Sequence, residues 1–271
     1  MELPQQVRSQ MKFGNEGRGS GHLAILCGIF LLSLSSLARA DITGTVTLQG
    51  APNSKDETFT ATAKGCGESP LRKTENWKVG PKGQLGDVVV WIVDPKFYTG
   101  PEEMERSIKP QLIEINQIGC RYSPHVVAVQ AGIPFKIING DPTIHNIRAK
   151  VYGGPLKPPG ADVPGFNFGQ TRQGQADEKQ LDPPGIYTLQ CDVHNWMQCW
   201  VMVLNSSCFG VTGTDGVFNL QRSAELADGD YKIDAWHPRF AQTLEQTIHV
   251  KKGAITPSAG VNFQFDGTKS F

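Results

Sequence analysis

The chain has 271 residues and carries 26 basic and 26 acidic side chains, so its formal net charge is zero. That balance leaves no basic patch for nucleic acid and no basic amphipathic helix for a membrane surface. The length gives room for one large domain or two small ones.

The first forty residues have the composition of a secretion signal. Basic residues precede an apolar stretch over 23–34, and Ala38-Arg39-Ala40 has the small-x-small form of a cleavage site. The apolar stretch is shorter than the roughly 20 residues that a membrane-spanning helix needs. We therefore expect cleavage before Asp41, a periplasmic or secreted location and no membrane insertion afterwards. Four basic and two acidic residues leave with the signal, so the mature chain has a net charge of −2.

The rest of the chain predicts β structure. Short runs of Val, Ile, Thr and aromatic residues are separated by Gly, Pro, Asn and Asp, and only Pro101–Ile108 could form a helical turn. The polar stretch Asn53–Lys82 and the Pro/Gly-rich stretch Gly153–Pro164 are expected to be loops. Many short strands with frequent turns favour an all-β sandwich or barrel. The expected strands are Ile42–Leu48, Val88–Val93, His125–Gln130, Phe135–Asn139, Gly185–Gln190, Cys199–Leu204, Phe209–Thr212, Val217–Leu220, Asp230–Trp236, Gln242–Val250 and Val261–Phe265.

Five cysteines remain after the signal, an odd number: Cys66, Cys120, Cys191, Cys199 and Cys208. An exported protein is in an oxidising compartment, where its cysteines are expected to form disulfides. With an odd number of cysteines, one thiol remains unpaired. We expect this thiol to be Cys191, because a histidine follows it at three residues and a methionine at six. Our hypothesis pairs Cys66 with Cys120, and Cys199 with Cys208. The alternative is that Cys191 is itself disulfide-bonded.

Four side chains form a donor set for copper. They are His145, Cys191, His194 and Met197. One thiolate, two imidazoles and one weak axial thioether are the ligands of a type 1 (blue) copper centre, whose chemistry is electron transfer. A tight loop between two strands would bring the last three ligands together, and a proline-containing turn precedes the first. Structural zinc is the alternative, but zinc prefers four strong N/S ligands and a methionine favours copper.

Residues 111–205 resemble a cupredoxin, the fold of plastocyanin and amicyanin. The Cys-x2-His-x2-Met loop is similar to the short ligand loop of amicyanin, and His145-Asn146 is similar to the His-Asn pair of cupredoxins. The resemblance implies a Greek-key β-sandwich with one type 1 copper. It implies that Asn146 hydrogen-bonds to the ligand loop and that His194 is the exposed edge through which the electron leaves. Asn195 departs from the pattern, because amicyanin-like loops often have proline there.

The C-terminal segment resembles carboxypeptidase regulatory-like (prealbumin-like) β modules. The resemblance lies in Phe209–Leu220, with its T-D-x-G-x-F-x-L hairpin pattern, and in Gly229–His237. The opening strands of such modules match segments far upstream. We therefore expect residues 41–95 and 206–271 to form one discontinuous sandwich into which the cupredoxin is inserted. The simpler alternative adds 41–95 to the cupredoxin itself.

The expected domains are a signal peptide (1–40), an N-terminal β segment (41–110), a cupredoxin domain (111–205) and a prealbumin-like β module (206–271). The mature chain also resembles the methylamine-utilisation-type cupredoxin proteins of bacteria, which implies a periplasmic redox or copper role.

The function expected from the sequence is single-electron transfer between periplasmic redox proteins that the sequence does not identify. Two alternatives stay open: copper storage or delivery, and a β module that binds a partner or a glycan with the copper domain as an accessory. We expect no enzyme, because a multicopper oxidase needs many histidines in His-x-His pairs, and the mature chain has five histidines and no such pair. His125 and His237 are expected to be structural. Trp196 is expected to cover the metal or to offer an apolar docking face, and the alternative is that it is simply buried.

Overall fold

The computed structural model describes residues 42–93, 112–152, 165–220, 226–258 and 260–271. The expected signal peptide, the possible helical turn at 101–108 and the expected loop at 153–164 lie outside these ranges. Within them, regular structure consists of β-strands and one 3-10 turn, η2 (Gly267–Lys269), which confirms the all-β prediction. No helix in the described ranges has the length and apolar character to cross a bilayer.

The strands expected from the sequence are present, with ends shifted by at most two residues. They are β1 (Ile42–Gln49), β4 (Val89–Ile92), β7 (Val126–Gln130), β8 (Phe135–Asn139), β12 (Gly185–Gln190), β13 (Gln198–Leu204), β14 (Phe209–Val211), β15 (Val217–Leu220), β16 (Gly229–Trp236), β17 (Leu244–Lys251) and β19 (Val261–Asp266).

Further strands have no clear sequence signal. They are β2 (Thr58–Thr60), β3 (Leu71–Lys73), β5 (Glu114–Gln117), β6 (Tyr122–Ser123), β9 (His145–Tyr152), β10 (Asn167–Gln170), β11 (Ala176–Lys179) and β18 (Ala254–Thr256). Most of them are short, and several lie at sheet edges with few buried side chains. Such strands bury too little apolar surface to leave an alternating pattern.

The described strands from β5 to β13 form a β-sandwich. One sheet has the strand order β10-β9-β12-β13-β7 and the other has the order β11-β8-β5-β6. The inward residues of both sheets share one core, in which Phe135 and Tyr187 are fully buried. Burial alternates along β8 and β9, as expected for strands with one face on a core. We call this unit the first sandwich.

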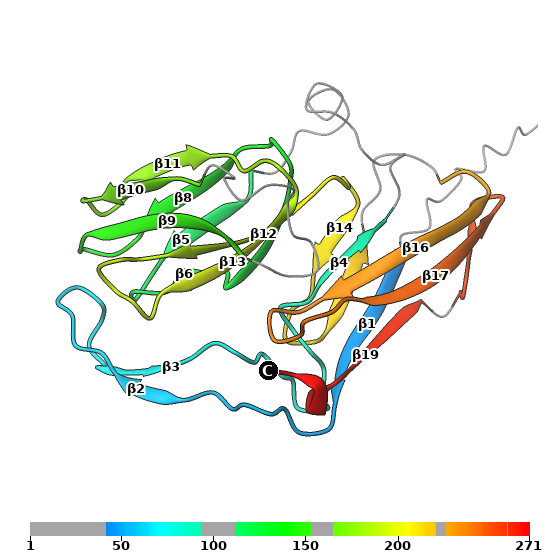
Figure 1. Ribbon diagram of the computed structural model, residues 1–271, viewed down its shortest axis with the longest axis horizontal. Helices are drawn as coiled ribbons and strands as arrows, with labels where there is room; N and C mark the ends of the chain where they lie inside the picture. Colours follow the sequence, from blue (N-terminus) through cyan, green and yellow to red (C-terminus); the bar gives the residue numbers. More distant parts are fainter. Residues whose placement is uncertain (1–41, 94–111, 153–164, 221–225, 259) are drawn as a thin grey trace, which may run out of the picture. The chain divides into compact units, whose positions relative to one another are not determined.

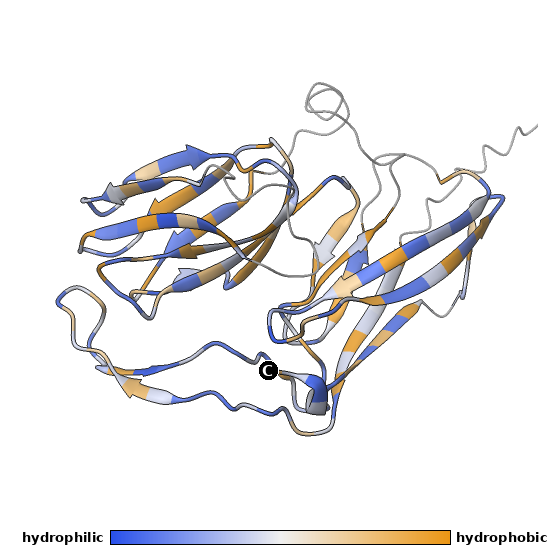
Figure 2. Ribbon diagram, in the orientation of Figure 1, coloured by the Kyte–Doolittle hydropathy of each residue, from blue (hydrophilic) through white to orange (hydrophobic). Residues whose placement is uncertain are grey.

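Strands from both ends of the described chain form a second pair of sheets, which we call the second sandwich. In one sheet β1 pairs antiparallel with β15 and parallel with β19, and in the other β4 pairs with β14 and β16 (Figure 1). Their apolar residues share a second core. Figure 2 shows apolar and polar bands alternating along β16 and β17, in keeping with one buried face. The upstream strands β1 and β4 therefore pair with strands of the C-terminal segment.

A third apolar cluster contains side chains from both sandwiches. Val126, Ala128 and Met202 of the first sandwich pack with Val89 and Trp236 of the second. All five are at most 2% exposed. The two sandwiches therefore share buried apolar surface, which favours their association by the hydrophobic effect.

The polar stretch 53–82 contains a hairpin, so the expectation of a plain loop is wrong there. Strands β2 and β3 pair with each other as a two-stranded sheet, and Cys66 lies in the connection between them. The expected Cys66–Cys120 disulfide is present and ties this connection to the first sandwich, against whose core the partly buried Ala63 packs. Leu71 is 60% exposed. The hairpin thus lacks the apolar face whose alternating residues would have allowed its strands to be predicted.

The expected Cys199–Cys208 disulfide is wrong. The two cysteines are not bonded to each other, and they lie in different cores, Cys199 in the first sandwich and Cys208 in the second. The chain passes from the first sandwich to the second in the few residues between these two cysteines. Burial raises the pKa of the Cys199 thiol, which keeps it protonated and unreactive.

His237 is a buried neutral histidine in the second sandwich. It is 1% exposed, its ring stacks on Trp77 at 5.2 Å, and its Nδ1 accepts a hydrogen bond from the Arg239 amide at 3.2 Å. Burial, helped by the charges of His125 and Arg239, lowers the pKa of His237 to about 3. The structural role expected for this residue agrees with these contacts.

We expect His237 to make the protein less stable in acid. Between the unfolded pKa of about 6.5 and the folded pKa, only the unfolded chain binds this proton, so stability falls as pH falls. Lowering the pH from 7 to 4.5 should cost about 2 kcal/mol through this group. Urea unfolding of wild type and His237→Asn at both pH values isolates its share, because the other histidines are common to both. An equal loss in the two proteins would contradict the expectation.

Candidate metal centre

Three donor atoms converge at one end of the first sandwich. His145 Nδ1 lies 3.1 Å from His194 Nδ1, and Cys191 Sγ lies 4.0 Å from the first nitrogen and 3.7 Å from the second. All three residues are buried. Two metal–ligand bonds of about 2.0–2.3 Å that meet at an angle of roughly 100–120° separate their donor atoms by about 3–4 Å. The donor set therefore fits one soft metal ion in size and in chemistry.

The local structure explains this convergence. His145 is the first residue of β9, and the other donors lie in the turn that joins β12 to β13. The register Gln190↔Gln198 leaves only seven residues for that turn. It is closed by hydrogen bonds from the Met197 amide to the His194 carbonyl, 2.9 Å, and from the Cys191 amide to the Met197 carbonyl, 3.4 Å. Because β9 pairs with β12, the turn lies beside the start of β9.

Two backbone amides hold the Cys191 sulfur in place. It accepts hydrogen bonds from the amides of Asn146, 3.3 Å, and His194, 3.4 Å. The first donor belongs to the residue that follows His145 and the second to His194 itself, so these bonds fix the sulfur relative to the two imidazoles.

Asp141 fixes the tautomer of His145. Its carboxylate accepts a hydrogen bond from His145 Nε2 at 3.0 Å, so the lone pair of the ring is on Nδ1, which faces Cys191 and His194. The same carboxylate also accepts from the amides of Gly119 and Cys120, at 2.7 and 2.8 Å. A carboxylate that orients a ligand histidine in this way is common behind metal sites. Burial lowers the pKa of His145, and Asp141 offsets part of that shift.

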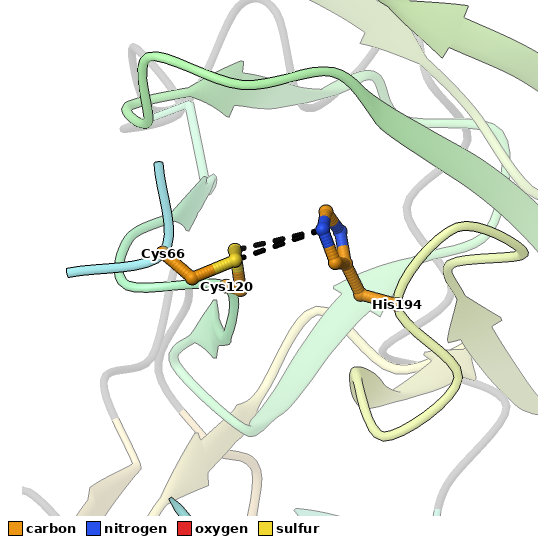
Figure 3. Close-up of side chains that lie close together, drawn as sticks. All are labelled: Cys66, Cys120 and His194. Carbon is orange, nitrogen blue, oxygen red and sulfur yellow. Dashed lines mark hydrogen bonds between the residues drawn. A yellow bond between two sulfur atoms is a disulfide. The ribbon is translucent and has the colours of Figure 1, made fainter. Parts of the chain in front are cut away.

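His194 is not an exposed edge, so that expectation is wrong. The residue is 3% exposed, and burial lowers its pKa with help from His145. Its Nε2, on the far side of the ring from the donor cluster, faces the Cys66–Cys120 disulfide at 3.6 and 3.9 Å (Figure 3). The cysteine-bearing connection of the β2–β3 hairpin covers this edge, a cover that no sequence pattern indicated.

Asn146 joins the ligand turn to the adjacent strand. Its side-chain oxygen accepts from the Asp192 amide at 3.2 Å, and its side-chain nitrogen donates to Phe168 O at 3.2 Å. Met197 is 2% exposed and belongs to the same core cluster as Cys191. Met197 is therefore a buried residue of the ligand turn.

Two neighbouring residues have other roles. His125 Nδ1 is 3.0 Å from the carbonyl of Gln198 and forms no part of the donor cluster, in keeping with a structural histidine. Trp196 lies 5.2 Å from the His194 ring, and its Nε1 donates to the Cys120 carbonyl at 3.0 Å. The Trp196 side chain thus helps to enclose the His194 ring.

The sequence pattern did not indicate the role of Asp141 as the partner of His145. The available signal was its position four residues before His145 in an Asp-Pro turn. A second ion pair, Arg148 to Asp192 at 2.7 Å, ties β9 to the ligand turn. The contacts of Asp141 with His145 and of Arg148 with Asp192 depend on how the chain folds around β9. The spacing of residues in the sequence does not predict that arrangement.

No family of known proteins matches the sequence, and no curated protein matches it. Among solved structures, an oxidised variant of amicyanin is 18% identical over 42% of this chain and 98% of its own, with a TM-score of 0.29. A purple cupredoxin from Nitrosopumilus maritimus is 22% identical over 34% of this chain and 99% of its own, with a TM-score of 0.26.

A copper-containing nitrite reductase (NirK) from Thermus scotoductus SA-01 is 19% identical over 36% of this chain, with a TM-score of 0.29. The match spans 23% of the reductase chain. Likenesses of this degree assign no function, which has to come from the side chains of the protein itself.

Proposed function

We propose that this protein is a type 1 copper protein that carries single electrons between periplasmic redox proteins. His145, Cys191 and His194 would hold the ion in a trigonal plane, with Met197 as the weak axial ligand. The observation that supports this best is the buried convergence of two Nδ1 atoms and one sulfur within 4.8 Å of one another. Copper held in such a set supplies a one-electron Cu(II)/Cu(I) couple.

The fold would keep the metal ligands rigid and shielded from water. Asp141 fixes one imidazole, two backbone amides fix the sulfur, and Asn146 ties the ligand turn to β10. The surrounding apolar core excludes water. A site whose ligands cannot rearrange loses little energy to reorganisation when the charge on the metal changes. We further propose that the first sandwich is cupredoxin-like and the second prealbumin-like, a likeness of fold that names no activity for the second.

The visible and EPR spectra of the protein after loading with Cu(II) test this function. We expect an intense thiolate-to-copper charge-transfer band and a reversible one-electron wave in cyclic voltammetry. A protein that binds Cu(II) without this band would contradict the type 1 assignment.

One observation favours copper storage or delivery as the second candidate. His194 is 3% exposed and faces a disulfide, whereas fast electron exchange needs a close approach of the partner to a ligand edge. Delivery predicts rapid loss of copper to a competing chelator and no reversible wave. Voltammetry and chelator exchange on the same sample separate the two functions.

Asp141→Asn is expected to weaken Cu(II) binding by roughly 10–100-fold. The amide removes the negative partner of His145 Nε2, and its NH₂ group can instead donate toward that ring, which favours the tautomer with the proton on Nδ1. Competition with a Cu(II) chelator measures the change. Asp87→Asn is the control, because Asp87 is also buried but pairs with Lys78 in another part of the chain. Equal affinities for the two variants would contradict this role of Asp141.

We also propose an exported, mature chain that begins at Asp41. The support is the composition of residues 1–40. N-terminal sequencing of the protein recovered from its native host or from a secreting host tests this. Recovery of an uncleaved chain from the cytoplasm would contradict it.

A further inference from the structure

A second group of potential metal ligands lies directly behind the first. Cys66 Sγ, Cys120 Sγ and His194 Nε2 lie within 4.8 Å of one another, and all three residues are buried. The two sulfurs are bonded to each other as a disulfide. Figure 3 shows the imidazole of His194 directed at them. His194 thus presents Nδ1 to Cys191 and Nε2 to the cysteine pair.

We propose that reduction of the Cys66–Cys120 disulfide creates a Cu(I) site made of the two thiolates and His194 Nε2. The donors are those that soft Cu(I) prefers. Two sulfurs and one nitrogen suit three-coordinate Cu(I), whereas structural zinc takes four ligands. This site uses none of the donor atoms assigned to the type 1 centre. When that centre is empty, His194 binds Cu(I) through Nε2 and keeps its ring proton on Nδ1. When both ions are bound, the ring releases this proton to solvent as well and bridges the two metals as imidazolate.

The chemistry balances with a dithiol as the reductant. Thiol–disulfide exchange breaks the Cys66–Cys120 bond, places one hydrogen on each sulfur and leaves the reductant as its cyclic disulfide. Binding of Cu(I) then releases the two thiol protons to solvent, and the metal keeps its oxidation state. The bound complex carries one net negative charge, and the Arg72 guanidinium, which donates to the Cys66 carbonyl, lies beside it.

Cys120 is held in place by contacts other than the disulfide. Its amide donates to Asp141 at 2.8 Å, and its carbonyl accepts from Trp196 Nε1 at 3.0 Å. These bonds come from the same carboxylate and the same ligand turn that surround the two histidines. The Cys120 sulfur is therefore expected to stay near His194 after reduction.

The Cys66 side is also anchored. A Cβ added to Gly65 would lie 2.8 Å from the Thr143 side chain, so the backbone of the connection packs closely against the turn before His145. Arg121 adds a hydrogen bond to the Lys73 carbonyl, 2.9 Å, and an ion pair with Glu75, 3.2 Å. The two cysteine Cα atoms are 5.0 Å apart, a spacing over which two thiolates can share one ion.

Local opening of the hairpin provides a route for the reductant. Within the described part of the chain, β2 and β3 pair only with each other. A two-stranded hairpin has marginal stability of its own, and segments with few buried contacts open at low cost. Opening would uncover a disulfide that is otherwise 0–1% exposed.

Cu(I) titration of the Cys191→Ser protein tests the site without the type 1 thiolate. The protein is titrated anaerobically against a coloured Cu(I) chelator, once oxidised and once after reduction by dithiothreitol and desalting. We expect one equivalent of tightly bound Cu(I) in the reduced protein and none in the oxidised protein. X-ray absorption of the reduced complex should show two sulfur scatterers and one nitrogen scatterer.

The control is Cys66→Ser/Cys120→Ser in the same background, which keeps Cys199 and Cys208. We expect it to bind no Cu(I) after the same reduction. Equal uptake by this control, no gain on reduction, or preference for zinc would each overturn the proposal. If Cys191→Ser does not fold, the wild-type chain still decides, since reduction should add one equivalent over the oxidised protein. Failure of the type 1 proposal would instead appear in the Cu(II) spectrum of oxidised wild type.

Discussion

Replacing Cys191 with serine is expected to abolish the thiolate-to-copper charge-transfer band. The band needs a sulfur anion bound to Cu(II), and the other donors near the ion are two imidazoles and a thioether. Loss of the thiolate should also weaken Cu(II) binding by at least tenfold, which is about 1.4 kcal/mol, because the remaining neutral donors bind less strongly. Visible absorption and chelator competition on the variant measure both effects.

Cys199→Ser is the matched control for that experiment. Cys199 is a buried thiol of the same core, but its sulfur lies near the carbonyls of Pro124 and Trp200 and not in the donor cluster. The control should keep the band at full strength per folded protein. If the band survived Cys191→Ser and disappeared in Cys199→Ser, the copper would be bound to Cys199, and the proposed site would be wrong.

Gly44→Ala is expected to lower the free energy of unfolding by about 3 kcal/mol or more. A Cβ at Gly44 would overlap the backbone carbonyl oxygen of Val261 and the ring of Phe218. The carbonyl is part of the parallel pairing of β1 with β19, so it cannot move aside without breaking that ladder. Overpacking against fixed neighbours typically costs about 1–3 kcal/mol, and more when backbone is involved.

Urea unfolding followed by circular dichroism measures the cost. Gly169→Ala is the control, because it is also a strand glycine and its added Cβ would meet its nearest atom, the His145 carbonyl oxygen, at 3.8 Å. We expect a change below about 1 kcal/mol for the control. Similar losses in both variants would show that Gly44 is not a point of close approach.

The donor cluster is the part of the site for which local sequence carries most information. Cys191 and His194 are three residues apart, so any tight turn brings them together, and His145 starts the strand that follows a proline turn. The cover over His194 could not be predicted in the same way. The hypothesis that Cys66 pairs with Cys120 is confirmed, but the two are 54 residues apart, and the position of their disulfide over His194 follows only from the fold.

The errors have related physical causes. The short spacing of Cys199 and Cys208 favoured a disulfide, but the chain leaves one core and enters another between them. The strands that the pattern revealed, such as β8 and β13, bury alternate or successive apolar residues. The strands that it did not reveal, such as β2 and β11, bury almost none and are held by their neighbours' hydrogen bonds. Sequence patterns report burial, and backbone pairing at an edge leaves little trace in them.

The pairing of β1 with β19 sets an order of events during synthesis. Strand β1 cannot meet its parallel neighbour until Val261–Asp266 have been made, whereas every described strand of the first sandwich is complete by Leu204. Because segments fold as units when their whole sequence is available, the first sandwich is expected to fold first. The nascent chain would then hold β1 as an unpaired strand, open to chaperones and to aggregation, until β15 and then β19 have been made.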